Sequence, residues 1–285
     1  MNRIGLAIAA LLLSSSAGWA EKAVEQTFPA YVDSDICSRL MLGPVTDKRI
    51  SCSKDTAKEG SSPAIVRGTD NMVLEVRNRK SVKKLVGEFA EVTGQVKEKA
   101  GNIKVASAKP IKRTDIPKGE INPKLWDVRN YRTKGDRVYE QVRHTLALMP
   151  YITDFDFISF AMVGDQVILT GWTIRITNRD SARRRVESVE GVGSVTNNIV
   201  VLPLGRMDMS IRAQARARLQ RHLSRYFWGS GSDIKIIVKN GDIILLGAVT
   251  RQADKDIANI QCRGVPGAFH VFNLLRVEPG KEKKG

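Results

Sequence analysis

Hydrophobic residues in the second half of the chain follow first a helical period and then a strand period. Val138, Val142 and Leu146 recur every four residues, which places them on one face of a helix. Downstream, apolar residues alternate on both sides of Gly164–Asp165, which indicates a hairpin with one buried face. The pattern then predicts a second helix that starts at residues 177–180, followed by a closing strand.

The same unit occurs a second time. One constant shift aligns Gly171 with Gly247 and Asn197 with Asn273, without a gap between them. The preceding helices align at a slightly smaller shift, which places Val138 on Ile211 and implies a three-residue insertion near residues 228–232 of the second copy. Because a repeat at a fixed spacing marks a repeated structural unit, the sequence predicts two αββαβ modules in tandem.

A different pattern precedes the repeat. Apolar residues alternate in segments 72–77, 89–96 and 103–109, and glycines separate these segments. Short antiparallel strands with tight turns, closed into a small barrel, are the simplest arrangement for such a pattern. Residues 87–111 resemble the C-terminal half of an OB-like barrel. The expected fold class is therefore α+β, a small OB-like β-barrel followed by two αββαβ modules. Two roles fit the barrel: a disulfide-stapled spacer or a ligand-binding domain.

The first twenty residues have the layout of a secretory signal peptide, with Arg3, an apolar run and then small residues up to Ala20. The apolar run is too short for the ~30 Å hydrocarbon core, so we expect cleavage near Ala20; a retained anchor is the alternative. The expected boundaries are a signal peptide at 1–20, an OB-like β-rich domain at 21–111, a linker at 112–134, one module at 135–203, a second module at 206–278 and a basic tail at 279–285.

The chain is strongly basic. Its formal net charge is +16, and it falls to +15 without the signal peptide because Arg3 is the only charged side chain removed. Such an excess favours anionic partners, which are nucleic acid, acidic lipid headgroups or acidic polymers. Because an exported protein rarely meets a genome, we expect no nucleic-acid partner. An anionic phospholipid surface or an acidic wall polymer is the expected class.

Three cysteines are present. In an oxidising compartment Cys37 and Cys52, fifteen residues apart, are expected to form a disulfide. Cys262 has no Cys or His beside it at metal-ligand spacing, so we expect a buried thiol and no metal site.

Two short motifs give the repeat a family resemblance. The first is a strand that ends in glycine, Val167-Ile-Leu-Thr-Gly171 and Ile243-Ile-Leu-Leu-Gly247. The second is the pattern Gly191-Val192-Gly-Ser-Val195-Thr-Asn197, from which the second copy departs with Gly267-Ala268-Phe-His-Val271-Phe-Asn273. In these residues the chain resembles the BON-domain family. The resemblance implies an exported envelope protein of the periplasmic osmotic-stress type, with affinity for phospholipid and no catalytic residues.

The first helix of the second copy, residues 211–228, carries five arginines and no acidic residue. Guanidinium groups bind phosphates and aromatic rings lie among headgroups, so this helix suits a membrane interface. A solvated face and contact with another polyanion are the alternatives. The residues expected to face inward are Ile211, Ala215, Leu219, His222 and Tyr226. The predicted lipid-binding residues are Arg212, Arg216, Arg218, Arg221, Arg225, Tyr226, Phe227 and Trp228.

Candidate catalytic chemistry is sparse. His144, His222 and His270 are the only histidines, and no local motif sets a nucleophile or an acid beside any of them. We therefore expect no enzyme activity, no cofactor and no metal. The expected function is binding of anionic phospholipid by an envelope protein, periplasmic or secreted and peripheral to the membrane. The alternatives are a protein-interaction scaffold of the envelope and binding of an acidic wall polymer through the barrel. The sequence leaves the oligomeric state open.

Overall fold

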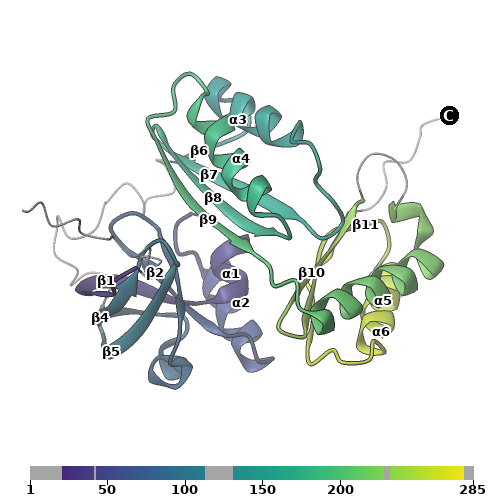
Figure 1. Ribbon diagram of the computed structural model, residues 1–285, viewed down its shortest axis with the longest axis horizontal. Coiled ribbons are helices and arrows are strands. Elements are labelled where there is room, and N and C mark those ends of the chain that lie inside the picture. Colours follow the sequence, from purple (N-terminus) through teal and green to yellow (C-terminus); the bar gives the residue numbers. More distant parts are fainter. Residues whose placement is uncertain (1–20, 42, 113–130, 228–231, 279–285) are drawn as a thin grey trace, which may run out of the picture.

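The computed structural model describes residues 21–41, 43–112, 131–227 and 232–278. The predicted signal peptide, most of the predicted linker, residues 228–231 of the predicted insertion and the basic tail lie outside these residues. The described chain forms a barrel and two α/β modules that meet along buried surfaces (Figure 1).

The N-terminal module is a closed barrel with the strand order β1-β2-β3-β5-β4, which confirms the expected small barrel. The pairings are antiparallel except that of β3 with β5. Two helices follow the first strand and were not expected from the period-two pattern. The strands and helices are β1 (Val24–Ser34), α1 (Asp35–Leu40), α2 (Asp47–Lys58), β2 (Pro63–Arg67), β3 (Val73–Val76), the 3-10 turns η1 (Arg79–Ser81) and η2 (Lys83–Leu85), β4 (Glu88–Lys97) and β5 (Asn102–Pro110).

The first αββαβ module has one strand more than the repeat pattern contains. Tyr131 and Arg132, which the sequence assigned to the linker, form β6 (Tyr131–Arg132) and pair with β7. Asp136 caps the first helix, because its carboxylate accepts hydrogen bonds from the backbone amides of Val138 and Tyr139, both at 3.0 Å. The other elements are α3 (Arg137–Ala147), β7 (Phe157–Val163), β8 (Gln166–Thr173), α4 (Ile176–Glu187) and β9 (Ser194–Val201).

Helix α4 begins at Ile176, slightly before the predicted start at residues 177–180. Its N-cap is Arg175, whose side chain makes no capping hydrogen bond. The strand order of this sheet is β6-β7-β8-β9, with β8 and β9 parallel.

The second module repeats the order with a broken closing strand. Residues Val271–Asn273 and Arg276–Val277 form two short strands that both pair parallel to β11, where the first module has one continuous strand. Its elements are α5 (Arg206–His222), the 3-10 turn η6 (Ser224–Phe227), β10 (Ile234–Lys239), β11 (Asp242–Val249), α6 (Gln252–Arg263), β12 (Val271–Asn273) and β13 (Arg276–Val277).

Both faces of each α/β sheet are buried, whereas the sequence predicted one buried face for each hairpin. Val167 and Leu169 pack beneath α3 and α4. Ile168, on the opposite face of β8, packs against Tyr31 and Val66 of the barrel. The prediction was wrong because alternation within a strand does not reveal that a neighbouring module covers the second face. Continuous apolar runs such as residues 243–246 indicate burial of both faces, since strands covered on both sides have apolar residues at successive positions.

The three modules share one apolar cluster around α1. Ile36 of α1 packs with Trp172 of the first module and with Ile237 and Phe272 of the second. Trp172 is fully buried there. The modules therefore form one body around a short helix of the barrel.

Candidate functional site

The arginine-rich helix α5 lies with α6 on the outer side of the second module (Figure 1). Ile211, Ala215 and Leu219 are buried in the module's core, as the pattern predicted. His222 is exposed, which corrects its expected inward position. The helix ends at His222, and Leu223 takes the buried place as the chain turns into η6.

Arg212 is not available to a ligand. It is 1% exposed, and it donates from Nη1 to the carbonyl of Pro203 at 2.9 Å and from Nη2 to that of Val238 at 2.6 Å. Its Nε has no partner among the described residues, and burial holds the pKa of its guanidinium below the ordinary value. Arg212 therefore ties α5 both to β10 of its own sheet and to Pro203, at the end of the first module.

The aromatic end of the predicted site is also partly internal. Tyr226 is buried, and its hydroxyl donates to the Asp254 carboxylate at 2.7 Å. Arg225 forms an ion pair with the same carboxylate, and its guanidinium lies over the Tyr226 ring. Phe227 packs against the module's core, and Trp228 lies outside the described residues. The expected cationic–aromatic surface is thus largely a set of contacts within the module.

Arg216 links the two α/β modules. Its Nε donates to the Asp154 carboxylate of the first module at 2.6 Å. The backbone amide of Ile236 donates to the carbonyl of the same Asp154 at 2.7 Å, so the loop also covers the free edge of β10. This flank of α5 faces the first module.

A smaller cationic surface remains on the opposite flank of α5. Arg218 and Arg221 are at least partly exposed, and the Arg218 guanidinium lies beside Gly264, directly after the exposed Arg263 at the end of α6. Ile260, one turn earlier, is 65% exposed. Within the described residues none of these arginines forms an ion pair. We call Arg218, Arg221, Arg263 and Ile260 the α5–α6 cationic face.

Sequence reasoning missed Arg263 and Ile260, although the signal was present. Asp254, Ala258 and Cys262 are buried and recur every four residues. That spacing turns Ile260 to the outer face of α6, where an apolar side chain gains nothing from the module's own core.

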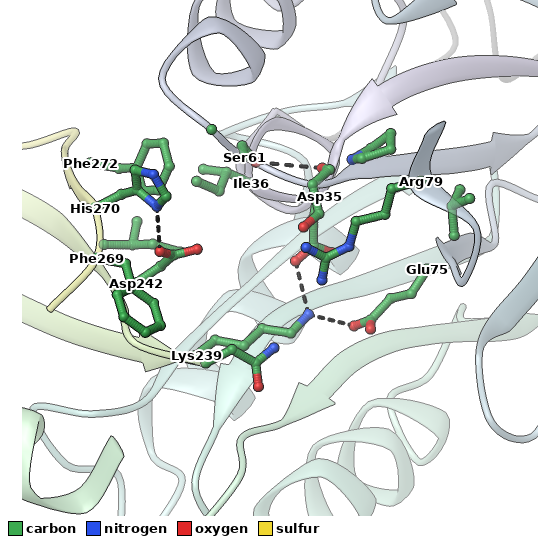
Figure 2. A pocket seen from close by; sticks show the side chains of 16 residues that line it. Asp35, Ile36, Ser61, Glu75, Arg79, Lys239, Asp242, Phe269, His270 and Phe272 are labelled. Carbon is green, nitrogen blue, oxygen red and sulfur yellow. Dashed lines mark hydrogen bonds and ion pairs between the residues drawn. The ribbon is translucent and has the colours of Figure 1, made fainter. Parts of the chain in front are cut away.

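A cavity of about 300 Å³ lies between the barrel and the second module. Figure 2 shows Lys239 reaching between Asp35 and Glu75, with donor–acceptor distances of 3.0 and 2.7 Å. Burial alone would raise the pKa of Asp35, but Lys239 and Arg39 outweigh it and hold that pKa well below the ordinary value. Lys239 of the second module is thus paired with two carboxylates of the barrel, and these ion pairs hold the two modules together.

The other side of the cavity carries a histidine. His270 Nδ1 and the Asp242 carboxylate are 2.7 Å apart, and the imidazole lies close to Gly60 of the barrel. Among the described residues, no nucleophilic side chain forms a hydrogen bond with this imidazole. The same part of the chain contains no cluster of side chains that could hold a metal ion.

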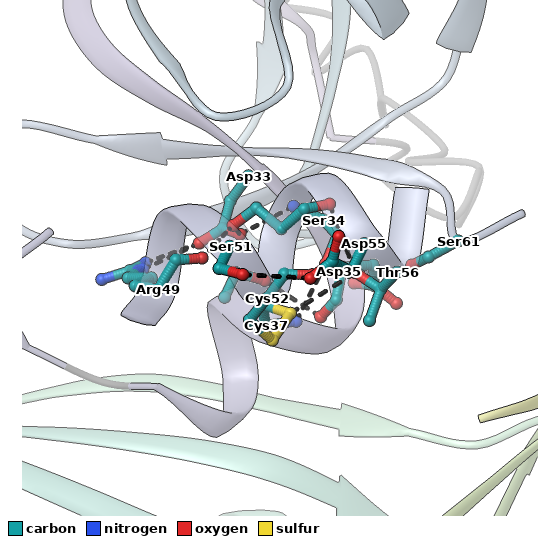
Figure 3. The surroundings of a disulfide bond; sticks show 12 residues. Asp33, Ser34, Asp35, Cys37, Arg49, Ser51, Cys52, Asp55, Thr56 and Ser61 are labelled. Atoms are coloured by element: carbon teal, nitrogen blue, oxygen red, sulfur yellow. Dashed lines mark hydrogen bonds and ion pairs between the residues drawn. A yellow bond between two sulfur atoms is a disulfide. The ribbon is translucent and has the colours of Figure 1, made fainter. Parts of the chain in front are cut away.

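The predicted disulfide between Cys37 and Cys52 is confirmed, and it joins α1 to α2 with a Cα–Cα distance of 6.0 Å (Figure 3). Beneath it the buried Asp33 carboxylate accepts from Arg49 Nε at 2.9 Å and from Ser53 Oγ at 2.5 Å. Disulfide and network together fix α1, the helix on which the three modules meet. Cys262 is free and buried, as expected, and burial raises the pKa of its thiol to about 12.

The described residues define a class, an α+β protein in which a closed barrel precedes two αββαβ modules. The family model of the BON domain matches residues 137–203 and 210–279. The chain is therefore a member of the BON-domain family with two tandem modules, as the motifs around Gly171 and Gly247 predicted. Comparison with curated proteins found no match. None of the helices in the described part of the chain has the length and apolar character needed to cross a bilayer.

Two of the solved structures to which the chain is similar are both of one protein. One is of the C-terminal domain of CdsD, a structural protein of the type III secretion system of Chlamydia trachomatis, at 12% identity over 52% of this chain and 100% of that chain, with a TM-score of 0.21. The other, also of CdsD of Chlamydia trachomatis, is at 14% identity over 51% and 94%, with a TM-score of 0.19. These scores are too low to support an argument about assembly.

Proposed function

We propose that this protein is a non-enzymatic component of the bacterial cell envelope that binds anionic phospholipid membranes peripherally through its second BON module. The observation that carries the proposal is the α5–α6 cationic face, where two neighbouring helices present three arginines without acidic partners among the described residues, together with an exposed isoleucine. The tandem BON modules, the net charge of +16 and the signal-like N-terminus support the same location.

The chemistry of this face suits a layer of phosphate headgroups. Guanidinium groups donate fork-shaped pairs of hydrogen bonds to phosphate oxygens, and Ile260 can lie among the upper acyl chains. A basic residue at an anionic membrane surface contributes about 1 kcal/mol, so the three arginines contribute roughly 3 kcal/mol. Binding of this strength is weak and reversible, and it depends on salt.

Co-sedimentation with vesicles tests the proposal. The wild-type protein should bind phosphatidylglycerol vesicles and ignore phosphatidylcholine vesicles, and binding should weaken as screening shortens to about 10 Å near 0.1 M salt. The triple variant R218Q/R221Q/R263Q should lose about a hundredfold in affinity, the equivalent of roughly 3 kcal/mol.

A matched control removes the same charge elsewhere. Lys80, Lys83 and Lys84 are exposed lysines of the barrel without ion-pair partners among the described residues. The variant K80Q/K83Q/K84Q loses three charges as well, so its binding should stay near wild type. Equal losses in the two variants would mean that net charge alone drives binding. No binding of the wild type would refute the proposal and leave the envelope scaffold or wall-polymer role.

A further inference from the structure

The first module exposes an apolar group that its own fold does not use. Leu148 is 63% exposed, Tyr151 73% and Ile176 55%. Leu148 is the C-cap of α3, Tyr151 follows it by three residues, and Ile176 opens α4. The side chain of Asn178, also in α4, donates to the carbonyl of Tyr151 at 3.3 Å, which holds the two ends together. Contiguous exposed apolar side chains mark interaction surfaces, whereas isolated ones are ordinary.

The backbone of Tyr151 makes this surface unusual. Its φ is +62°, in the left-handed region. Asn71 and Asn240 share that conformation, but asparagine accepts it readily, whereas a bulky side chain does so at a cost. A glycine or asparagine at residue 151 would suit the fold better. The position therefore carries a strained backbone and an exposed aromatic ring that contributes little to the module's core, which points to a role outside folding.

The chemistry around the ring fits a headgroup layer. The guanidinium of Arg175 lies over the Tyr151 ring, 5.8 Å from its centroid, and among the described residues it has no acidic partner. Tyrosine is enriched where one end of the side chain is apolar and the other is wet, and arginine beside it can bind a phosphate. We call Leu148, Tyr151, Arg175 and Ile176 the Tyr151 patch.

The loop that carries Tyr151 and the α5–α6 cationic face lie on opposite flanks of α5. Arg216 binds Asp154, three residues beyond Tyr151, whereas Arg218 lies beside Gly264 of α6. Two residues along a helix are about 200° apart, so these two arginines point to opposite sides. The solvent-facing side of α5 thus lies between Asp154, in the loop of Tyr151, and the α5–α6 cationic face.

We propose that the Tyr151 patch is a second membrane contact, in which Tyr151 and Ile176 enter the interface of an anionic bilayer and Arg175 binds a lipid phosphate. The inference rests on the proposed function. The occupant is the lipid surface already bound by the α5–α6 cationic face, and the first module thereby fixes how the protein lies on the membrane. A two-point contact strengthens binding because the second contact forms within an already bound molecule.

The glycine variant separates this role from folding. Tyr151→Gly removes the ring, and glycine adopts the left-handed backbone conformation of this position without strain, so the protein should remain folded. We expect its affinity for phosphatidylglycerol vesicles to fall about tenfold, as does that of Ile176→Gln, because buried apolar area is lost. The control variant K80Q/K83Q/K84Q should keep near-wild-type affinity.

A fluorescent label at residue 151 reports directly whether this position enters the bilayer. Tyr151→Cys, labelled with an environment-sensitive nitrobenzoxadiazole, should shift to shorter emission wavelength when phosphatidylglycerol vesicles are added, and a label at Lys83→Cys should not. If the wild type binds vesicles while the residue 151 label stays in water and Tyr151→Gly binds normally, the inference is overturned and the patch is left to a protein partner. If the wild type does not bind, the proposed function itself fails.

Discussion

Arg39 of α1 donates from Nη1 to the backbone carbonyl of Asn198 in β9 at 2.6 Å, and so joins the barrel to the free edge of the first module's sheet. The same guanidinium binds Asp35 through Nε at 2.9 Å. Lys239 of the second module reaches Asp35 at 3.0 Å, so a single carboxylate connects both contacts. The Arg39 side chain is only 1% exposed, so solvent screens the ion pairs of this junction poorly.

Replacing Arg39 with Met should separate the barrel from the BON modules. The variant leaves the Asn198 carbonyl unpaired and the junction short of one positive charge, and removing one member of a buried pair costs about 3 kcal/mol. Urea unfolding followed by circular dichroism should show a lower midpoint and two transitions. Arg67→Met is the control, because the ion-pair partners of Arg67 among the described residues, Asp70 and Glu98, both belong to the barrel. A single transition at the wild-type midpoint in Arg39→Met would contradict the assigned junction.

The Asp35 contact should make stability depend on acid pH. The folded-state pKa of Asp35 lies below its ordinary value, so its contribution is complete above the ordinary carboxyl pKa of about 4 and is lost as pH falls below it. Asp35→Asn should lower the free energy of unfolding by about 3 kcal/mol at pH 7, and the difference from wild type should shrink below about pH 4. A difference that stays constant down to about pH 2 would show that Asp35 acts through packing alone.

Two equivalent glycines should be equally intolerant of a side chain. A Cβ on Gly171 would lie 1.9 Å from the Phe157 carbonyl oxygen, and one on Gly247 would lie 1.9 Å from that of Asp233. Each φ is also positive, at +118° and +109°. Gly171→Ala and Gly247→Ala should each lower the free energy of unfolding by about 3 kcal/mol, since backbone must move in both.

Gly164→Ala isolates the conformational part of that cost. Its φ is +59°, but nothing lies within 4 Å of the added Cβ. Chemical denaturation should therefore show a loss of only about 1 kcal/mol. Equal losses at Gly164 and Gly171 would mean that the close contact with the Phe157 carbonyl is relieved without cost.

The free thiol of Cys262 should not react with thiol reagents in the folded protein. Cys262 is fully buried, and its raised pKa of about 12 leaves almost no thiolate at about pH 8. Ellman's reagent should detect no thiol in the native protein and one after unfolding in urea. Fast reaction of the native protein would show that α6 opens locally, and Cys262→Ser should abolish the signal in either state.

Local pattern was sufficient for much of this protein. The repeat, the order of elements in each BON module, the barrel strands β3, β4 and β5 and the Cys37–Cys52 pair all follow from periods of two or about four residues, from turn glycines and from cysteine spacing. These features depend on residues close together in the chain or on the exact recurrence of a unit, and a sequence displays both directly.

Only the tertiary structure decided which side chains are free to act. The sequence assigned Arg212 to the lipid-binding surface, yet it binds the backbone carbonyls of Pro203 and Val238. Tyr226 was assigned both to the inward face and to that surface, and its burial beside the Asp254 carboxylate decides for the inward face. Tyr151 showed no pattern, because its prominence depends on a backbone angle and on Arg175, which lies beyond the whole β7–β8 hairpin in the chain. Exposure depends on how the modules pack. The second face of each sheet becomes buried, and the junction at Arg39 forms, only when modules distant in sequence meet. Periodicity within one segment carries no information about these contacts.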